Sequence, residues 1–267
     1  MATFGFLGAG NMGGALARAA CKTLTPDKVI LSSRSMEKAR ALAAELGCRT
    51  AESPAVAEHA DYLFLGVKPQ MMAGLLKDLH PILKQRADRF LLVTMAAGLS
   101  IADIQRMAGG TYPVIRIMPN TPASISEGMI LYTCGTEVTK EEEAEFLHSM
   151  AGAGTFSALP ENLIDAGCSV SGCGPAFVDL FIEALADGGV ACGLPRAKAL
   201  EFAAQTIVGS AKLLQETGAH PGVLKDAVCS PGGSTIQGVR ALEKAGFRSA
   251  VMEAVIAAFE KNQALGK

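Results

Sequence analysis

The chain opens with a short apolar run that leads into a cluster of glycines. Residues Thr3–Leu7 favour a buried strand, and the apolar spacing from Ala15 to Leu24 is that of a helix. The glycine-rich segment GAGNMG, residues 8–13, joins the two. A strand, a tight turn and a helix in this order form the first half of a βαβ unit. The N-terminal part of the chain is therefore predicted to build a parallel sheet with right-handed crossovers.

Strands and helices continue to alternate over the first 150 residues. Further apolar strands are predicted at 29–33, 62–67, 90–95 and 114–118, with one more at the sheet edge over 128–133. Helices are predicted to begin near Ser35, Ser53, Met71 and Ser100, the last with Asp103 as its capping partner. Thr139 and Glu142 form a second capping box, which opens an acidic helix over 140–151. This order predicts an α/β fold with one doubly wound parallel sheet of the Rossmann type.

Strand signals stop after Pro160. Helices are predicted over about 161–170, 175–191, 195–216, 221–228 and 235–263, the last with a break near Gly246. We predict two domains, an α/β domain over 1–158 and an all-helical domain over 159–267. Leu200, Ile207 and Leu214 recur at helical spacing among many alanines and glycines. Helices with several apolar faces can pack against a second copy, so an interwoven homodimer is expected.

Composition excludes several classes of protein. Hydrophobic residues make up 49% of the chain, too many for a disordered protein. The 24 Lys and Arg balance 26 Asp and Glu without a basic block, so neither nucleic acid nor a membrane is expected as a partner. The seven cysteines never occur as Cys-x-x-Cys, which predicts no metal and no disulfide framework. Met1–Ala17 lacks a basic start, and no other stretch is expected to approach membrane-spanning length, so a cytoplasmic protein is predicted.

The segment GAGNMG matches the G-x-G-x-x-G pattern of dinucleotide-binding folds. In that pattern Gly8 makes the tight turn, Gly10 lets the backbone approach a pyrophosphate, and Gly13 allows the helix to pack closely. The free amides at the helix start then face the phosphates. The alternative is a glycine-rich turn without a ligand, but its position between the first strand and the first helix favours a nucleotide cofactor.

The end of the second strand predicts which dinucleotide binds. An acidic residue there would accept hydrogen bonds from the ribose 2′-hydroxyl of NAD. The sequence instead runs Ser32, Ser33, Arg34, whose hydroxyl and guanidinium groups can donate to a 2′-phosphate. NADPH is therefore favoured, and NADH remains open as a second reductant. The alternative is that Arg34 lies in a solvated loop without a ligand.

A second anion site is suggested at SPGGST, residues 230–235, just before a helix. Two glycines expose consecutive backbone amides at a positive helix end, which suits a carboxylate. A plain turn between two helices is the alternative, and spacing alone does not decide between them.

Several motifs in order resemble one enzyme family over essentially the whole chain. They are FLGAGNMG (6–13), VKPQ (67–70), MAAG (95–98), MPNTPA (118–123), VSGCGPAF (170–177), EALADGGVACGLPR (183–196) and HPGVLKDAVCSPGGSTI (220–236). With these the chain resembles the pyrroline-5-carboxylate reductases, which complete proline biosynthesis. The resemblance implies an NADP-binding Rossmann domain followed by a helical substrate and dimerisation domain. It leaves open a larger oligomer, such as a decamer of dimers.

The resemblance also implies which residues form the site. The implied cofactor-binding residues are Gly8, Ala9, Gly10, Asn11, Met12, Gly13, Ser33, Arg34, Ser53, Val67, Lys68, Pro69, Ala96, Ala97, Gly98 and Asn120. The implied substrate-binding residues are Glu161, Gly232, Gly233, Ser234 and Thr235. Three positions depart from the family pattern: Cys173 stands where serine is usual, Ser234 where alanine or threonine is common, and Ala227 lacks a polar side chain that some members direct to the cofactor.

The implied reaction is hydride transfer from NADPH to the C=N carbon of 1-pyrroline-5-carboxylate, which gives L-proline. A cyclic imine can enter already protonated, so the site needs no strong general acid. Thr235, taken as the catalytic residue, would orient the ring nitrogen while the loop amides hold the carboxylate. The four histidines, His59, His80, His148 and His220, are interpreted as structural.

Two rival functions are disfavoured by the same residues. A β-hydroxyacid dehydrogenase would carry a catalytic lysine about four residues after the glycine of the domain-linking helix, where this chain has Val178 and Asp179. A non-enzymatic NADPH sensor or scaffold dimer would keep GAGNMG but would have no use for the carboxylate cradle at 230–235.

Overall fold

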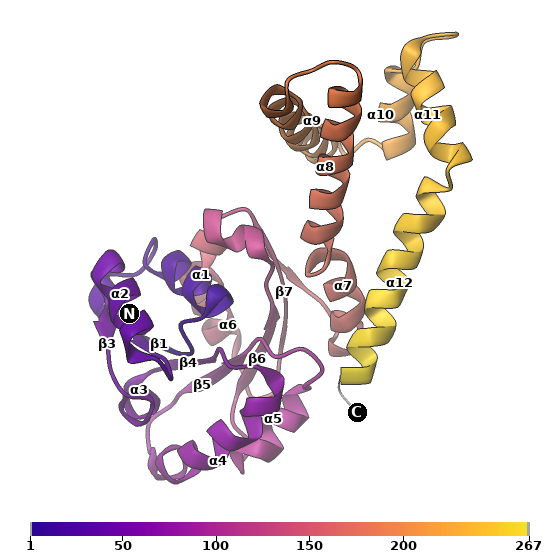
Figure 1. Ribbon diagram of the computed structural model, residues 1–267. Helices are drawn as coiled ribbons and strands as arrows, with labels where there is room; N and C mark the ends of the chain where they lie inside the picture. The colour runs from indigo at the N-terminus through magenta and orange to yellow at the C-terminus, as the bar shows by residue number, and fades with distance from the viewer. Residues whose placement is uncertain (1, 266–267) are drawn as a thin grey trace. The chain divides into compact units, whose positions relative to one another are not determined.

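The computed structural model describes residues 2–265 and divides into two compact units (Figure 1). The sheet unit comprises Met1–Cys173 with Ala258–Lys267, and the helical unit comprises Gly174–Ala257. The outermost residues of the two predicted domains, 1 and 266–267, lie outside the described residues. Residues 159–173 pack with the sheet unit, whereas the predicted boundary at 158/159 assigns them to the helical domain.

The sheet unit is built on one eight-stranded sheet with the order β3-β2-β1-β4-β5-β6-β7-β8. The strands are β1 (Phe4–Leu7), β2 (Val29–Ser32), β3 (Arg49–Thr50), β4 (Tyr62–Leu65), β5 (Leu91–Thr94), β6 (Val114–Met118), β7 (Gly128–Cys134) and β8 (Gly154–Ala158). The first six are parallel, which confirms the Rossmann prediction. The sequence predicted neither the two-residue β3 nor the half-exposed β8.

The end of the sheet differs from the prediction of parallel strands throughout. β7 runs antiparallel to β6 and lies inside the sheet rather than at its edge. The two strands are joined by only a short 3-10 helix, η2 (Thr121–Ile125), and a parallel crossover needs a dozen or more residues. β8 pairs parallel with β7 because helix α6 (Lys140–Ser149) lies between them in the chain. β8 therefore takes the edge position.

Helices cover both faces of the sheet. Besides α6 and η2 the sheet unit contains α1 (Asn11–Ala20), η1 (Pro26–Lys28), α2 (Met36–Leu46), α3 (Ser53–His59), α4 (Pro69–Gln85), α5 (Ile101–Ala108), η3 (Ala151–Ala153), η4 (Glu161–Leu163) and α7 (Ile164–Ser171). Both predicted capping boxes are confirmed, at Ser100 with Asp103 and at Thr139 with Glu142. The first helix begins at Asn11, directly after the glycine turn, so its N-terminus lies closer to the strand end than the apolar pattern indicated.

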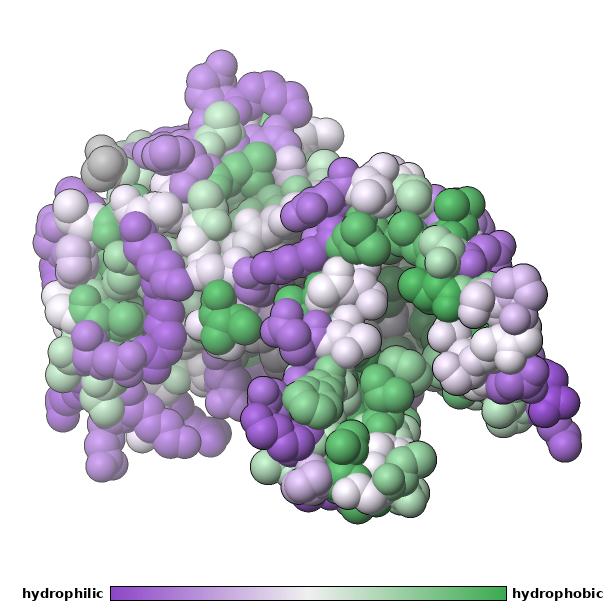
Figure 2. Space-filling model, turned by 90° about the horizontal axis from the view of Figure 1, so that it is seen from above, coloured by the Kyte–Doolittle hydropathy of each residue, from purple (hydrophilic) through white to green (hydrophobic). Residues whose placement is uncertain are grey.

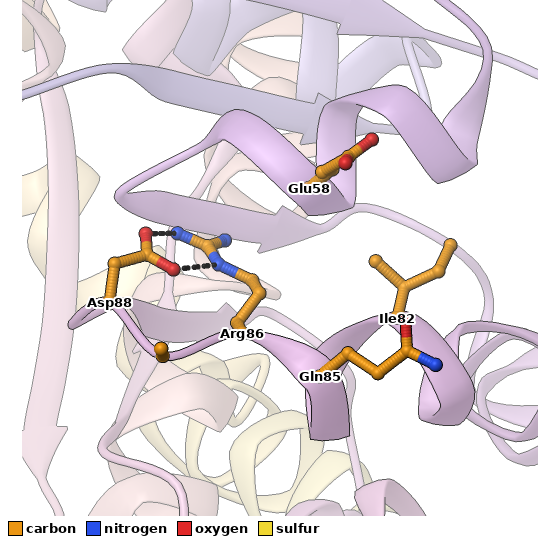
Figure 3. A pocket seen from close by; sticks show the side chains of 6 residues that line it. Glu58, Ile82, Gln85, Arg86 and Asp88 are labelled. Carbon is orange, nitrogen blue, oxygen red and sulfur yellow. Dashed lines mark hydrogen bonds and ion pairs between the residues drawn. The ribbon is translucent and has the colours of Figure 1, made fainter.

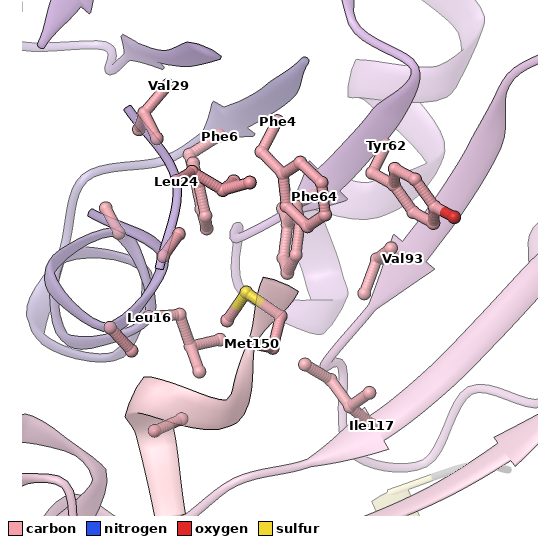
Figure 4. Packing of buried hydrophobic residues seen from close by; sticks show 14 of the residues in the cluster. Phe4, Phe6, Leu16, Leu24, Val29, Tyr62, Phe64, Val93, Ile117 and Met150 are labelled. Atoms are coloured by element: carbon pink, nitrogen blue, oxygen red, sulfur yellow. The ribbon is translucent and has the colours of Figure 1, made fainter. Parts of the chain in front are cut away.

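An aromatic layer holds the first strands together on one face of the sheet (Figure 4). The rings of Phe4 and Tyr62 stack with centroids 4.6 Å apart, and those of Phe6 and Phe64 with centroids 4.3 Å apart. Burial of such rings, at roughly 25 cal/mol per Å² of apolar surface, supplies much of the driving force for this layer. The glycine turn after β1 is therefore attached to a rigid support.

The helical unit has a much smaller core. It contains α8 (Gly174–Ala191), α9 (Arg196–Thr217), α10 (Pro221–Ala227), α11 (Ser234–Lys244) and most of α12 (Phe247–Leu265), and the predicted break at Gly246 is confirmed. Its buried apolar cluster is made of small residues, Ala186, Ala199 and Ala203. Large apolar side chains remain exposed, including Leu180 at 68% and Phe202 at 50%. Figure 2 shows apolar side chains as green patches on the surface of these helices.

One helical run meets the length and composition expected of a membrane span. It covers Glu161–Ala191, 31 residues that include an 18-residue window with a mean hydropathy of 1.3, so the expectation that no stretch approaches membrane-spanning length is wrong. The sequence predicted two helices here, over about 161–170 and 175–191, and in the structure α7 likewise ends at Ser171 and α8 begins at Gly174. α8 carries three acidic residues, Asp179, Glu183 and Asp187. Charged side chains are costly in the hydrocarbon core of a membrane.

Candidate active site

A cleft of about 560 Å³ lies at the carboxyl ends of the parallel strands. It forms where the strand order changes direction, with β2 on one side of β1 and β4 on the other, the usual binding position in open α/β sheets. Its lining residues come from the ends of β1, β4, β5 and β6: Gly10, Asn11, Met12, Gly13, Gly66, Val67, Lys68, Met95, Met118 and Pro119. Gly66, Met95, Met118 and Pro119 were not among the predicted site residues, although Gly66 adjoins the motif VKPQ and the other three lie within the motifs MAAG and MPNTPA.

The three motif glycines meet three different constraints. Gly8 has φ +117°, and a Cβ atom there would overlap the Gly66 carbonyl oxygen. A Cβ atom on Gly13 would overlap the Gly8 carbonyl oxygen, so only glycine lets α1 approach the strand end. A Cβ atom on Gly10 would meet nothing within 4 Å, because this residue faces the open cleft.

The N-terminus of α1 suits a phosphate group. Gly10 occupies the N-cap position without a side-chain cap, and no acidic residue lies in the first turn. The first amides of a helix have no partner within the helix, and they carry the positive end of its dipole. An anion of the size of a pyrophosphate can satisfy these amides from the side on which Gly10 leaves space. The residues of the cleft therefore fit a dinucleotide.

The end of β2 brings together three of the predicted ribose-side residues. Ser33 is half-buried and Arg34 exposed, directly after the strand. Ser53, at the start of α3, lies at the same strand end, since its Oγ is 3.0 Å from Oγ of Ser32, the last residue of β2. The strand end carries hydroxyl and guanidinium groups and no carboxylate, as a 2′-phosphate requires.

The remaining cofactor positions lie on two strand ends. Val67 and Lys68 line the cleft after β4, and Pro69 begins α4. Ala96–Gly98 follow β5, and Gly98 has φ +74°, a backbone conformation that favours glycine. This loop leads into α5, where bonds from Ser100 lower the pKa of the Asp103 carboxyl.

Asn120 lies beside the cleft but its side chain is buried, at 8% exposure. Its Nδ2 donates to the Ser171 carbonyl at 3.0 Å, and its Oδ1 accepts from the Met129 amide at 3.0 Å. Both ends of the amide are therefore used within the protein. Asn120 holds the loop after β6 between β7 and the end of α7.

Glu161, predicted at the edge of the substrate site, begins η4 in the sheet unit. Its Oε1 accepts from the Ile101 amide at 2.7 Å and lies 3.5 Å from Nη1 of Arg116. Arg116 also donates to Asp165 at 2.8 Å. The sequence reading missed Arg116, whose place within an apolar strand, VIRIM, was the available signal.

The predicted carboxylate loop lies in the helical unit. The Gly233 amide donates to the Ser230 carbonyl at 3.0 Å, which closes a turn in which Gly232 has φ +71°. Gly233 is the N-cap of α11 without a side-chain cap, and Ser234 and Thr235 are exposed in the first turn. The free amides and two hydroxyls thus occur together at one helix end. His220 has a different role, since its Nδ1 accepts from the Gly222 amide and caps α10.

A second, smaller cavity of about 380 Å³ lies near the ends of α3 and α4 (Figure 3). Its most polar side chain, Arg86, is fully engaged: it donates to the carbonyls of Ala57 and Ala60, and it forms a two-point contact with Asp88. Its guanidinium also stacks on Phe90, 4.2 Å from the ring centroid. These contacts use all of the guanidinium nitrogens, so Arg86 has a structural role.

Comparison with known families matches both units. Residues 161–265 match the family model described as pyrroline-5-carboxylate reductase dimerisation. Residues 3–98 match the model described as NADP oxidoreductase, coenzyme F420-dependent. The first match covers α7 and the exposed apolar helices, and the second covers β1 through the loop after β5.

Curated relatives and solved structures agree across the full chain. The pyrroline-5-carboxylate reductase of Escherichia coli is 42% identical over 266 residues, 98% of each chain, and that of Arabidopsis thaliana is 40% identical over 98% of this chain and 95% of its own. The crystal structure of Plasmodium falciparum pyrroline carboxylate reductase with NADP bound has a TM-score of 0.88 at 31% identity and covers 100% of this chain and 98% of its own. With identity of this extent across both units, the chain belongs to the pyrroline-5-carboxylate reductase family.

Proposed function

We propose that this protein reduces 1-pyrroline-5-carboxylate to L-proline with NADPH, the last step of proline biosynthesis. The observation that carries the proposal is the full-length similarity to reductases of that name, joined to a cleft whose glycines and helix end fit a dinucleotide. The printed title of the Plasmodium falciparum structure names NADP as the bound cofactor of that relative.

In this proposal the cofactor-binding residues belong to the sheet unit, and the loop that binds the substrate carboxylate belongs to the helical unit. NADPH, when bound, supplies the hydride. Asn11 and Met12 present backbone amides to phosphate, while Ser33 and Arg34 face the 2′-phosphate. Gly233 and Ser234 present amides to the substrate carboxylate, and Thr235 orients the ring nitrogen. Because a protonated imine already accepts a hydride, no histidine or lysine is required as an acid.

The proposed function is tested by following NADPH oxidation with 1-pyrroline-5-carboxylate, beside its six-membered homologue, and by identifying proline as the product. We expect turnover with the five-membered imine and less with the larger ring, because the loop and Thr235 set the ring position. Absence of turnover with both imines in a folded, NADPH-binding protein would refute the proposal.

The double variant Ser33→Ala, Arg34→Ala is expected to lose affinity for NADPH and to keep its affinity for NADH. Only NADPH carries the 2′-phosphate that these side chains address, and charge-assisted bonds contribute roughly 1.5 to 3 kcal/mol each. The KM for NADPH should therefore rise about 10-fold or more, as measured by steady-state kinetics with each cofactor. Equal losses with both cofactors would contradict this role.

Thr235→Ala should lower kcat/KM for the imine by about 5- to 150-fold, the equivalent of roughly 1 to 3 kcal/mol for one hydrogen bond. Some turnover should persist because the protonated imine needs no proton from the enzyme. Complete inactivity of a folded Thr235→Ala protein would instead identify Thr235 as a proton donor. Kinetics with both substrates varied separately distinguishes the two cases.

The exposed apolar helices are proposed to pack against a second copy of the chain as a homodimer, and a larger oligomer such as a decamer of dimers stays open. Support comes from the dimerisation model over 161–265 and from the exposed Leu180, Phe202 and Met252. We also propose a cytoplasmic enzyme without a membrane partner, and the balanced charge supports the absence of a nucleic-acid partner. A monomeric protein at micromolar concentration that remains fully active would contradict the proposal that two subunits pack through their helical domains.

A fragment of residues 1–173 is expected to fold and bind NADPH without turnover. A fragment of 1–158 would remove Glu161 and Asp165, the ionic partners of the buried Arg116, and should unfold at a lower temperature. Leaving a buried charge unpaired costs about 3 to 5 kcal/mol. Thermal unfolding and NADPH titration of the two fragments measure the difference, and equal stability would contradict the role of residues 159–173.

A further inference from the structure

Arg116 is a buried cation that none of the sequence motifs includes. It is the middle residue of β6 and is 3% exposed. Because side chains alternate along a strand, Arg116 shares a face of the sheet with Val114 and Met118. Val114 packs in a cluster with residues of α4 and α5, whereas Met118 packs in another with Ile164 of α7. Arg116 therefore lies between the parts of the face that α5 and α7 cover.

The guanidinium of Arg116 joins this strand to the segment that leads into the helical unit. Its Nη2 donates to Asp165 in the first turn of α7, and its Nη1 faces Glu161 at the start of η4. Its Nε is buried and finds no hydrogen-bond partner among the described residues. A buried charge with incomplete pairing is costly and is seldom the most stable choice for a strand interior. Such a residue calls for a reason other than stability.

The reason lies in Glu161, because its carboxylate accepts hydrogen bonds from two different segments of the chain. Oε1 receives the Ile101 amide at the start of α5 as well as Nη1 of Arg116. No hydrogen bond within residues 2–265 uses Oε2, and the side chain is 34% exposed. One oxygen of the carboxylate is thus immobilised, while the other remains an acceptor. A carboxylate at this place also favours a protonated, positively charged imine.

The residues that follow Arg116 also contact the C-terminal end of α7. Two residues beyond Arg116 the chain lines the cleft at Met118 and Pro119, and Asn120 then donates to the Ser171 carbonyl. Ala97 of the loop after β5 packs against the same cluster as Ile164. The segment from Arg116 to Asn120 therefore holds α7 at both ends while it forms one wall of the cleft.

We propose that Arg116 is a positioning residue of the reductase, which holds Glu161 and α7 in place so that the free carboxylate oxygen is presented to the imine. The inference rests on the proposed function, since the substrate role of Glu161 comes from the family resemblance. Arg116 acts through Glu161 and touches neither substrate nor cofactor. It should therefore affect the KM for the imine and leave cofactor binding intact.

The test begins with Arg116→Met, which keeps an unbranched apolar stem and removes the charged guanidinium. The KM for 1-pyrroline-5-carboxylate should rise about tenfold, the effect of one charge-assisted bond, with kcat changed less than about threefold and NADPH affinity within about twofold. Arg116→Lys should restore part of the loss, because an ammonium keeps the charge but cannot span two carboxylates. A tenfold loss of NADPH affinity in either variant would overturn the proposal.

Arg89→Met is the control. Arg89 is likewise paired with a carboxylate, that of Glu142 at the capping box of α6, but its side chain is 54% exposed and lines neither cavity. Its removal should leave the KM for the imine unchanged. An equal rise in both variants would mean that Arg116 contributes only general stability, and would overturn the proposal.

A double-mutant cycle with Glu161→Gln separates positioning from packing. If Arg116 acts through Glu161, the double variant should have the same KM for the imine as Glu161→Gln alone. Additive effects would overturn the proposal. Should Arg116→Met fail to fold, Asp165→Asn removes one partner of the guanidinium and enters the same cycle, with the same two outcomes.

Hydrogen exchange keeps this inference distinct from the proposed function. In Arg116→Met the amides of residues 161–171 should exchange faster than in Arg89→Met, because α7 loses its anchor to β6. Unchanged exchange would overturn the positioning role. If the unmodified protein fails to reduce the imine while exchange in Arg116→Met accelerates as expected, the proposed function fails and the anchoring by Arg116 stands.

Discussion

Replacing Gly233 by valine is expected to abolish detectable turnover of 1-pyrroline-5-carboxylate while NADPH binding persists. A Cβ atom at this position would overlap Oγ of Ser230 and would lie 3.1 Å from the Ser230 carbonyl oxygen. The serine side chain can rotate away, but the carbonyl cannot, since it accepts the Gly233 amide that closes the turn. A branched side chain would also fill the space above the free amides of α11. The carboxylate of the substrate would lose the whole cradle.

The measurement is steady-state turnover together with NADPH titration. Gly238→Ala, within α11, is the control, because a Cβ atom there meets nothing within 4 Å and alanine favours the helix. Normal turnover in Gly233→Val would mean that the carboxylate binds elsewhere. Loss of NADPH binding in the same variant would show that the lesion is not confined to the helical unit.

The second large effect is expected for substitutions of Gly10 and Gly13. Both variants should lose NADPH binding, but for different reasons. Gly10→Ala has open space around its new Cβ atom and an extended N-cap conformation that alanine can adopt, so the fold should be retained. The methyl group would occupy the approach of the pyrophosphate. Loss of two charge-assisted bonds of roughly 1.5 kcal/mol each predicts an NADPH affinity lowered by about 100-fold or more.

Gly13→Ala should lose stability as well as NADPH binding. Its Cβ atom would overlap the Gly8 carbonyl oxygen, so α1 would be displaced from the end of β1, at a cost of roughly 1 to 3 kcal/mol for overpacking. Gly14→Ala is the control, since its Cβ atom would lie 3.4 Å from Cδ2 of Leu42. Thermal unfolding and NADPH titration of the three variants decide the matter. A Gly10→Ala protein that binds NADPH normally would show that the phosphate does not approach this glycine.

The elements that local patterns define were predictable. β1, β2 and β4 to β6 appear as short apolar runs because strands buried on both faces contain little else, and the capping boxes at Ser100 and Thr139 identify helix starts without tertiary information. The break at Gly246 follows from the same kind of local rule, since glycine readily adopts a positive φ.

Elements that depend on their neighbours were less predictable. β3 and β8 are two and five residues long, and half-exposed residues in them give no apolar run. The reversed direction of β7 depends on the length of the connection after β6, and the apolar pattern of a strand does not contain its direction. The sheet unit extends to Cys173 because α7 packs against β7. The composition of the segment around residue 158 gave no sign of this packing.

By itself, the sequence determined the Rossmann domain, the all-helical second part, the dinucleotide motif and the candidate carboxylate loop, because each is encoded by residues adjacent in the chain. Only the tertiary structure decided that Ser53 lies at the end of β2 and that Met95, Met118 and Pro119 line the cleft. It also decided that Arg116 meets Glu161 and Asp165 across 45 and 49 residues. The physical reason is that contacts between distant segments depend on strand order and helix packing, which local periodicity does not record.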